Sequence, residues 1–297
     1  MNRHAYMIIA HHQFQLLQML CQLLDDERND IYIMIDKKVK NFDESIIIKS
    51  VQHSKVFFTD RIKIQWGGKS IVNAEIMLLK AASKNKYSYY HLLSGADLPI
   101  KTADTIYNFF ELNNGKEFIH FCNDGFIKKQ SALRAGQYHF FQDKIGPNKH
   151  IFLYKLERFS LFVQRKLNID RLKKMPQICC GSQWFSITHE FARYILEHEK
   201  DIDKMFNYTA CADEMFMQTL LLHSPYLKNR YQTEDESSYI SCMRYICWYE
   251  NLHPYTWKSK DFDLLINSDF LFARKFDLNT DKDICKKIYE YLKFKMK

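Results

Sequence analysis

Short apolar runs alternate with amphipathic stretches in the first part of the chain. Residues 6–10 and 31–35 are apolar runs, and residues 14–24 between them carry apolar side chains at helical spacing. This order predicts two buried parallel strands joined by a helix. His11 and Asp36 follow directly after the two strands. Ligands of parallel sheets bind at the carboxyl ends of the strands, so a ligand site is expected beside these two side chains.

The same patterns continue through the chain and predict a single α/β domain. Further strands are expected at residues 56–58, 87–93, 118–121, 180–187 and 240–248, and helices at residues 71–82, 104–112, 151–167 and 189–198. Ser70 is expected to cap the helix at residues 71–82. No Gly- or Pro-rich linker interrupts the 297 residues, which argues for one domain. No Gly-rich phosphate loop is present, so neither a dinucleotide fold nor a P-loop is supported.

Carboxylates stand at two informative places. Asp97 lies on a Gly- and Pro-bounded loop after the strand at residues 87–93. Such an Asp commonly points into a ligand cleft, and the alternative is an Asx turn that closes the loop. Asp213 and Glu214 precede an apolar helical face, where the helix dipole favours charged carboxylates and one of them can act as a general base. The alternative is that Asp213 caps the helix and Glu214 is an ordinary first-turn acid.

The charge balance is basic, with 43 Lys and Arg against 35 Asp and Glu, a net charge of +8. This suits an anionic partner such as a nucleotide sugar or a lipid headgroup. Much of the excess lies at residues 149–174 and 286–297, which are either basic amphipathic helices on an anionic membrane or solvated helix faces. The basic residues form no recognised nucleic-acid module, so nucleic acid is not an expected partner.

The cysteines and the ends of the chain bear on location. The 8 Cys lack metal-ligand spacing and are expected to be reduced and mostly buried. The chain shows no signal peptide and no apolar run long enough to span a membrane. These features predict a cytoplasmic protein, with peripheral contact at the inner face of a bacterial membrane as the further expectation.

Several spaced motifs together resemble one family. They are Ile-Asp-Lys-Lys at residues 35–38, Leu-Ser-Gly-Ala-Asp-Leu-Pro-Ile at 93–100, Gly-Ser-Gln-Trp at 181–184, Asp-Glu at 213–214, Arg-Tyr-Ile-Cys-Trp at 244–248, His-Pro at 253–254 with Trp257, and Phe-Ala-Arg-Lys-Phe-Asp at 272–277. In this order they resemble the core-2/I-branching β-1,6-N-acetylglucosaminyltransferases, a family that also holds the peptide O-xylosyltransferases. The resemblance covers nearly the whole chain, and the short N-terminus looks like that of a bacterial-type member.

The resemblance implies a glycosyltransferase A-type fold, a Rossmann-like mixed sheet flanked by helices. It divides the chain into a nucleotide-binding half at about residues 1–122, an acceptor and catalytic half at about 123–280, and a basic C-terminal helix at 281–297. It implies inverting transfer from a UDP-sugar, with GlcNAc as the expected sugar and xylose as the alternative, to a glycan or lipid-linked saccharide in polysaccharide biosynthesis. No cofactor and no metal are expected.

The resemblance also assigns the site residues. Glu214 is the base that deprotonates the acceptor hydroxyl, and Arg244 and Lys275 hold the diphosphate. The remaining assignments are His11 and Asp36 beside the uridine, Ser94 and Asp97 on the donor side, and Trp184 and Asp213 on the acceptor side.

The sequence is consistent with a site in which Arg and Lys side chains, and not a metal ion, neutralise the diphosphate. The Asp-x-Asp candidates at 201–203 and 261–263 do not end apolar strands, and the loop at Asp97 offers one carboxylate. Arg and Lys can neutralise a diphosphate instead, and Arg274 is the alternative to its neighbour Lys275. Two other functions stay open: a glycoside hydrolase using Asp97 and Glu214 as a carboxylate pair, and a non-catalytic binding protein.

Overall fold

A computed structural model describes residues 2–145, 151–231, 238–249 and 253–296. Its centre is a six-stranded sheet in the order β3-β2-β1-β4-β7-β6. The strands are β1 (His4–Ala10), β2 (Asn29–Ile35), β3 (Lys55–Phe58), β4 (Tyr89–Ser94), β6 (Phe118–Ile119) and β7 (Phe185–Thr188). The first four are parallel, whereas β7 pairs antiparallel with both β4 and β6. The expected mixed α/β fold is confirmed.

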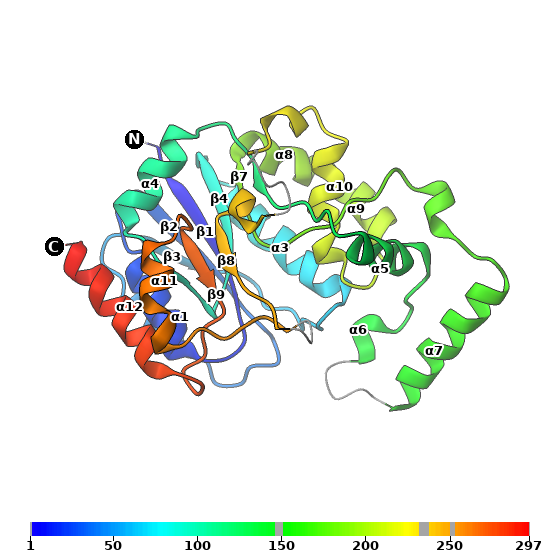
Figure 1. Ribbon diagram of the computed structural model, residues 1–297, viewed down its shortest axis with the longest axis horizontal. Coiled ribbons are helices and arrows are strands. Elements are labelled where there is room, and N and C mark those ends of the chain that lie inside the picture. Colours follow the sequence, from blue (N-terminus) through cyan, green and yellow to red (C-terminus); the bar gives the residue numbers. More distant parts are fainter. Residues whose placement is uncertain (1, 146–150, 232–237, 250–252, 297) are drawn as a thin grey trace.

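Helices cover both faces of this sheet, which explains why β1 and β2 are apolar without alternation. One face carries α1 (Phe14–Leu23), α2 (Ser45–Ile48), α4 (Ala103–Leu112), α11 (Phe262–Asn267) and α12 (Lys282–Lys295). The other carries α3 (Lys69–Ala82), α8 (His189–Glu197), α9 (Glu199–Phe206) and α10 (Phe216–Leu222). Side chains alternate along β1 between the two cores, with Ile8 on the first side and Met7 on the second. The layers are visible in Figure 1.

A second, three-stranded sheet lies against the first and carries several residues of the predicted site. It consists of β5 (Asp97–Pro99), β9 (Phe272–Arg274) and β8 (Arg244–Ile246), in the order β5-β9-β8. Its register places Asp97 opposite Arg274 and Arg244 opposite Phe272. The expected strand at residues 240–248 is wrong in its first part, because residues 239–242 form a 3-10 helix before β8.

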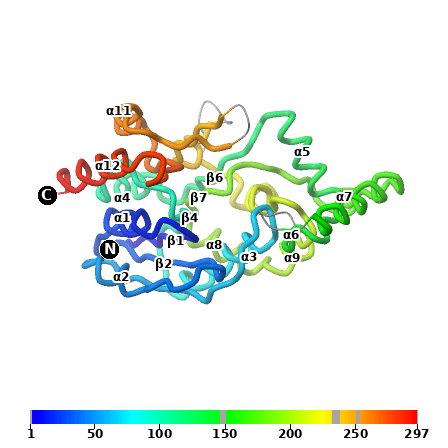
Figure 2. Tube along the Cα trace, turned by 90° about the horizontal axis from the view of Figure 1, so that it is seen from below, coloured from blue at the N-terminus to red at the C-terminus, as the bar shows by residue number. Residues whose placement is uncertain are grey.

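Helices also dominate residues 123–176, which extend away from the sheet (Figures 1 and 2). They form α5 (Gly125–Gly136), α6 (Gln142–Ile145), the expected α7 (Ile151–Lys166) and a 3-10 helix (Arg171–Lys174). The sequence pattern did not predict α5, because only Ser131, Ala135 and Gly136 of its residues are buried. Among the described residues, no helix combines the length and apolar character needed to cross a bilayer.

Two smaller predictions are corrected. Ser70 does not cap α3, which begins at Lys69, two residues earlier than expected, with Gly68 at its N-cap. The Ser70 hydroxyl instead donates to Asp143 Oδ1 at 2.7 Å and accepts from the backbone N–H of Gln65 at 2.9 Å. The strand expected from residue 180 begins at Phe185, because the preceding residues run alongside Cys122 and Glu214 without joining the central sheet.

Candidate active site

The carboxyl ends of β1 and β2 bring His11 and Asp36 into one region, as the sequence predicted. The backbone N–H of Asp36 donates to the Ala10 carbonyl at 2.9 Å, and its carboxylate pairs with Lys38 at 3.3 Å. The His11 ring stacks on His12 with 4.2 Å between the ring centroids. Partial removal from water and the His12 charge lower the pKa of His11, while Asp36 acts in the opposite direction. The predicted contact of both residues with uridine stays a prediction.

The Asp97 side chain is hydrogen-bonded within the loop after β4. Its two carboxylate oxygens accept from the Ser94 backbone N–H and the Ser94 hydroxyl, both at 2.8 Å. Gly95 is required here, since a Cβ on it would lie 2.8 Å from the Cβ of Ala10. Asp97 is only 2% exposed. A pairing of Asp97 with Glu214 in a glycoside hydrolase does not fit this arrangement, because such a carboxylate must reach the substrate.

Arg274 is the cation that this loop orients. Its guanidinium lies 3.7 Å from Asp97 Oδ1 and covers the Trp184 ring at 3.9 Å from the ring centroid. The Nη1 atom, which faces Asp97, is buried and has no hydrogen-bond partner among the described residues, so its donors are not used within that part of the protein. Lys275 is the neighbouring half-buried cation, and its charge lowers the pKa of His12. Arg274 and Lys275 therefore lie between Trp184 and the end of β1.

Arg244 does not fit its predicted role at the diphosphate. It is 2% exposed, and its guanidinium donates to the carbonyls of Leu92 and Phe185 and to the Ser186 hydroxyl, at 2.8–3.2 Å. A further bond of 2.6 Å reaches the Cys242 carbonyl. Burial lowers its pKa to about 10. Arg244 thus fastens β8 to β4 and β7 beneath the site. Both of its Nη atoms donate to the protein, and its Nε is buried without a hydrogen-bond partner among the described residues.

Glu214 lies at the entrance of α10 and remains accessible. It ends a 3-10 helix (Ala212–Glu214), and 41% of its side-chain surface is exposed. Arg134 of α5 donates to Glu214 Oε2 at 3.1 Å. The surrounding protein raises the pKa of Glu214, while Arg134 acts to lower it. A carboxylate whose pKa is raised holds a proton more tightly, which suits a group that accepts one during the reaction.

Asp213 lies behind Glu214 and does not cap the helix. It is 7% exposed, and its Oδ1 has no hydrogen-bond partner within the described ranges. Burial and the Glu214 charge raise the pKa of Asp213 to about 7. The predicted contact of Asp213 with the acceptor does not fit this burial, because the 3-10 helix that precedes α10 turns its side chain toward α3 and away from solvent.

Glu75 of α3 is a site residue that the sequence analysis missed. It is 2% exposed and accepts from Gln183 Nε2 at 2.7 Å. Burial and the charge of Asp213 raise the pKa of Glu75 well above its ordinary value. A carboxylate between Val72 and Ile76, on the buried side of a helix, was the sequence signal that could have identified it. Arg134 was missed as well, since nothing in a sequence pairs it with Glu214.

Residues 181–184, here called the linking segment, connect the carboxylates to the cations. The Gly181 N–H donates to the Glu214 carbonyl at 2.9 Å, Gln183 holds Glu75, and Trp184 lies under Arg274. A Cβ on Gly181 would lie 1.8 Å from the His120 carbonyl oxygen, so only glycine fits. The structure therefore brings Glu214, Trp184 and the Arg274–Lys275 pair to one region.

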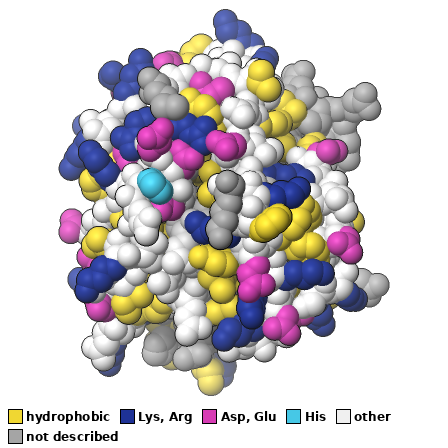
Figure 3. Space-filling model, turned by 90° about the vertical axis from the view of Figure 1, so that its left-hand side faces the viewer, with side chains coloured by type: hydrophobic (Ala, Val, Ile, Leu, Met, Phe, Trp, Pro, Cys, Tyr) yellow, Lys and Arg dark blue, Asp and Glu magenta, His cyan; other side chains and the backbone are white. Residues whose placement is uncertain are grey.

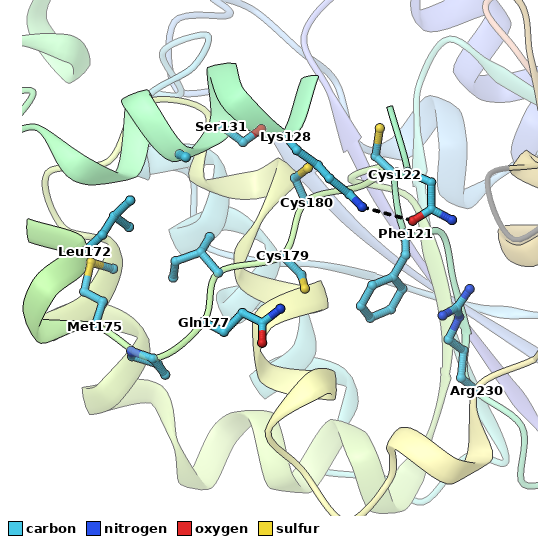
Figure 4. Close-up of a pocket in the computed structure, with 14 residues that line it drawn as sticks. Phe121, Cys122, Lys128, Ser131, Leu172, Met175, Gln177, Cys179, Cys180 and Arg230 are labelled. Atoms are coloured by element: carbon cyan, nitrogen blue, oxygen red, sulfur yellow. Dashed lines mark hydrogen bonds between the residues drawn. The ribbon is translucent and has the colours of Figure 1, made fainter. Parts of the chain in front are cut away.

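A cavity of about 470 Å³ adjoins this region between α5 and the residues that precede the linking segment. Lys128 and Ser131 line it from α5, and Cys179 and Cys180 line it from the other side (Figure 4). None of the predicted donor-site residues lines it. Since α5 also carries Arg134, the cavity lies on the Glu214 side of the site. All eight cysteines are free thiols in this structure.

Comparisons with known proteins point to one family. The sequence model of the Core-2/I-Branching enzyme family matches residues 4–266. Xylosyltransferase 2 of Rattus norvegicus is 22% identical over 306 residues, covering 95% of this chain and 33% of that protein. Xylosyltransferase 1 of Homo sapiens is 23% identical over 319 residues, covering 98% of this chain and 30% of that protein. This chain thus spans about a third of the length of these relatives.

The chain is also similar to solved structures. The crystal structure of mouse xyloside xylosyltransferase 1 in its apo form matches 94% of this chain and 99% of its own, with a TM-score of 0.40 and 10% identity. The two curated relatives are mammalian, and the expectation of a bacterial-type member stays a prediction. The family match extends over most of the chain, from β1 into α11, and includes the whole six-stranded sheet, whereas β9 of the second sheet lies beyond it; the protein belongs to the Core-2/I-branching enzyme family of glycosyltransferases.

Proposed function

We propose that this protein is an inverting, metal-independent transferase that moves a sugar from a UDP-sugar to a hydroxyl of a glycan or lipid-linked saccharide. The observation that carries the proposal is the linking segment, which contacts Glu214 at one end and lies under Arg274 at the other. A single displacement needs a base on one side of the anomeric carbon and a stabilised leaving group on the other. The linking segment supplies a frame for both.

On the donor side, Arg274 and Lys275 neutralise the diphosphate as the bond between the sugar and UDP breaks. Arg274 has an unused donor and is held between Asp97 and Trp184, so its guanidinium is pre-positioned. Fixed cations stabilise developing charge without reorganisation. This assignment replaces Arg244 with Arg274, and it keeps Lys275. His11 and Asp36 remain the proposed uridine contacts.

On the acceptor side, Glu214 takes the proton of the attacking hydroxyl. The oxygen forms a bond to the anomeric carbon while the bond to the UDP oxygen breaks, and the proton ends on the Glu214 carboxylate. Arg134 pairs with Glu214 and acts to lower its pKa, which favours the charged form of the base before the reaction. Trp184 is only 8% exposed and Arg274 covers one of its faces, so it supports the Arg274 guanidinium and does not present an open surface to the acceptor.

Supporting evidence for metal independence comes from the arrangement of side chains. In the described part of the chain, no three His, Cys, Asp or Glu side chains gather in a way that would hold a metal ion. At the Asp97 loop, the carboxylate is occupied by Ser94. A divalent ion bound there would depend on substrate oxygens for most of its ligands.

GlcNAc is the proposed donor sugar, and xylose is the alternative that the names of the curated relatives favour. Thermal shift with UDP, UDP-GlcNAc and UDP-xylose, followed by donor hydrolysis, distinguishes the two. In the Glu214→Gln variant we expect loss of transfer with UDP binding retained. The Glu190→Gln variant, which alters the first-turn acid of α8, is the matched control. Full activity of Glu214→Gln would remove Glu214 from the role of base.

A further inference from the structure

Helix α7 presents its apolar side to solvent and its polar side to the protein. Phe152, Phe159 and Phe162 are 76%, 64% and 52% exposed. Glu157 and Gln164, in contrast, are each 4% exposed. A surface helix normally shows the opposite arrangement, with its apolar stripe toward the core. The outward apolar side therefore needs an explanation other than packing within this chain.

Specific hydrogen bonds fix this orientation. Glu157 accepts from the Phe141 backbone N–H at 3.2 Å and pairs with His139 Nδ1 at 3.0 Å. Gln164 accepts from the Tyr138 N–H at 2.7 Å and donates to the Tyr138 carbonyl at 2.9 Å. Rotation of α7 to bury its phenylalanines would break these bonds and leave buried polar groups unpaired, which is costly.

The outward side also carries a single sign of charge. Lys155, Arg158, Arg165 and Lys166 are exposed on α7, and the one acid of the helix, Glu157, faces inward. Directly after the helix, Leu167 adds a side chain that is 66% exposed. Exposed aromatic and aliphatic side chains interspersed with cations are typical of helices that lie in the interface of an anionic bilayer.

The basic C-terminal helix α12 differs from α7, although the same two interpretations applied to both segments from their sequences. Its apolar residues Ile284, Ile288 and Leu292 are buried in the core, and Lys286 faces Glu290 at 3.7 Å. At this end of the molecule, basic and acidic side chains are intermingled on the surface (Figure 3). Helix α12 is thus an ordinary packed helix with a solvated face. It lies at the opposite end of the molecule from α7 (Figures 1 and 2).

We propose that α7 docks on an anionic lipid bilayer, with Phe152, Phe159 and Phe162 in the interface and the Lys and Arg side chains at the headgroups. A second copy of the chain is a poorer occupant, because two such faces would bring like charges together. The inference does not depend on the transferase chemistry, since α7 supplies none of the proposed catalytic or donor-binding residues. It would hold the enzyme beside acceptors carried on lipid.

The test is cosedimentation of the full chain with phosphatidylcholine vesicles, with and without phosphatidylglycerol. We expect binding to the anionic vesicles alone, weakened by salt. The double variant Phe159→Ser/Phe162→Ser and the double variant Lys155→Gln/Lys166→Gln should each bind at least about tenfold more weakly. Phe294→Ser, which removes a 79% exposed phenylalanine from α12, is the matched control and should bind like the wild type.

Two results would overturn the proposal. One is failure of the wild type to bind anionic vesicles, or equal binding by the α7 variants. The other is a concentration-dependent dimer in sedimentation velocity that the Phe159→Ser/Phe162→Ser variant abolishes, since a second copy would then cover this face. Donor hydrolysis in solution should be unchanged in the α7 variants, which keeps failure of this proposal separate from failure of the proposed function.

Discussion

Replacement of Asp213 by Asn tests the electrostatics of the site most directly. Asp213 is buried next to Glu214, and the pKa of its carboxyl is raised from 3.8 to about 7. A group with a raised pKa in the folded state binds its proton more tightly there than in the unfolded chain. Its contribution to stability is complete at low pH and is lost as the pH rises toward the folded-state pKa.

The size of this effect follows from the two pKa values. A rise from 3.8 to about 7 corresponds to about 4 kcal/mol of unfolding free energy between low pH and pH values above 7. At about pH 5 the Asp of the unfolded chain is already charged, whereas Asp213 in the folded protein is still protonated. As the pH rises to about 8, folded Asp213 loses its proton and the unfolding free energy of the wild type should fall by about 3 kcal/mol. The Asn side chain of the variant has no proton to lose in this range, so the variant should keep this part of the unfolding free energy.

Urea unfolding at about pH 5 and about pH 8 measures the difference between Asp213→Asn and the wild type. We expect the variant to gain up to about 3 kcal/mol relative to the wild type across this interval. Asp201→Asn, an exposed acid of α9, is the matched control and should follow the wild type. A constant difference at both pH values would refute the reasoning, because it would mean that Asp213 does not titrate in this range in the folded protein.

Three further predictions concern activity. Arg274→Ala should reduce transfer by about a hundredfold and should lower the melting temperature less than Arg244→Ala. Arg244→Ala should lower it more, because three backbone carbonyls lose their donor; the reverse pattern would exchange the two roles. Arg134→Gln should shift the acidic limb of the pH–activity profile to higher pH, because Arg134 acts to lower the pKa of Glu214. The control is Arg193→Gln, which removes one partner of an exposed ion pair and should leave the acidic limb in place. Transfer should persist in EDTA, and a strict requirement for Mn²⁺ would contradict the metal-independent mechanism.

The elements of the fold that could be predicted are those whose signal is local. The strands at residues 6–10, 31–35, 56–58 and 87–93 are confirmed as β1 to β4, with ends within two residues of those expected. Their burial on both faces produces apolar runs that are readable without knowledge of their partners. The three-stranded sheet escaped prediction because each strand has three residues and pairs with segments far away in the sequence.

The site was harder to predict than the fold. An Arg within an apolar stretch, such as Arg244, is compatible with a ligand contact and with hydrogen bonds to buried carbonyls, and only coordinates separate the two. Arg274 was recognised as an alternative to Lys275, but its position over Trp184 depends on pairing between β5 and β9. Glu75 and Arg134 come from α3 and α5, and no local pattern connects either helix with Glu214.

The glycine at the start of the linking segment also limits the distance between Glu214 and Trp184. Gly181 is wedged against the His120 carbonyl and bonded to Glu214, so the segment starts from a fixed point. Three residues later the chain can have advanced by at most about 10 Å, which limits how far Trp184 can lie from that point. The backbone therefore limits the distance between the Glu214 carbonyl and Trp184, and moving Trp184 beyond that limit would require an insertion in the linking segment.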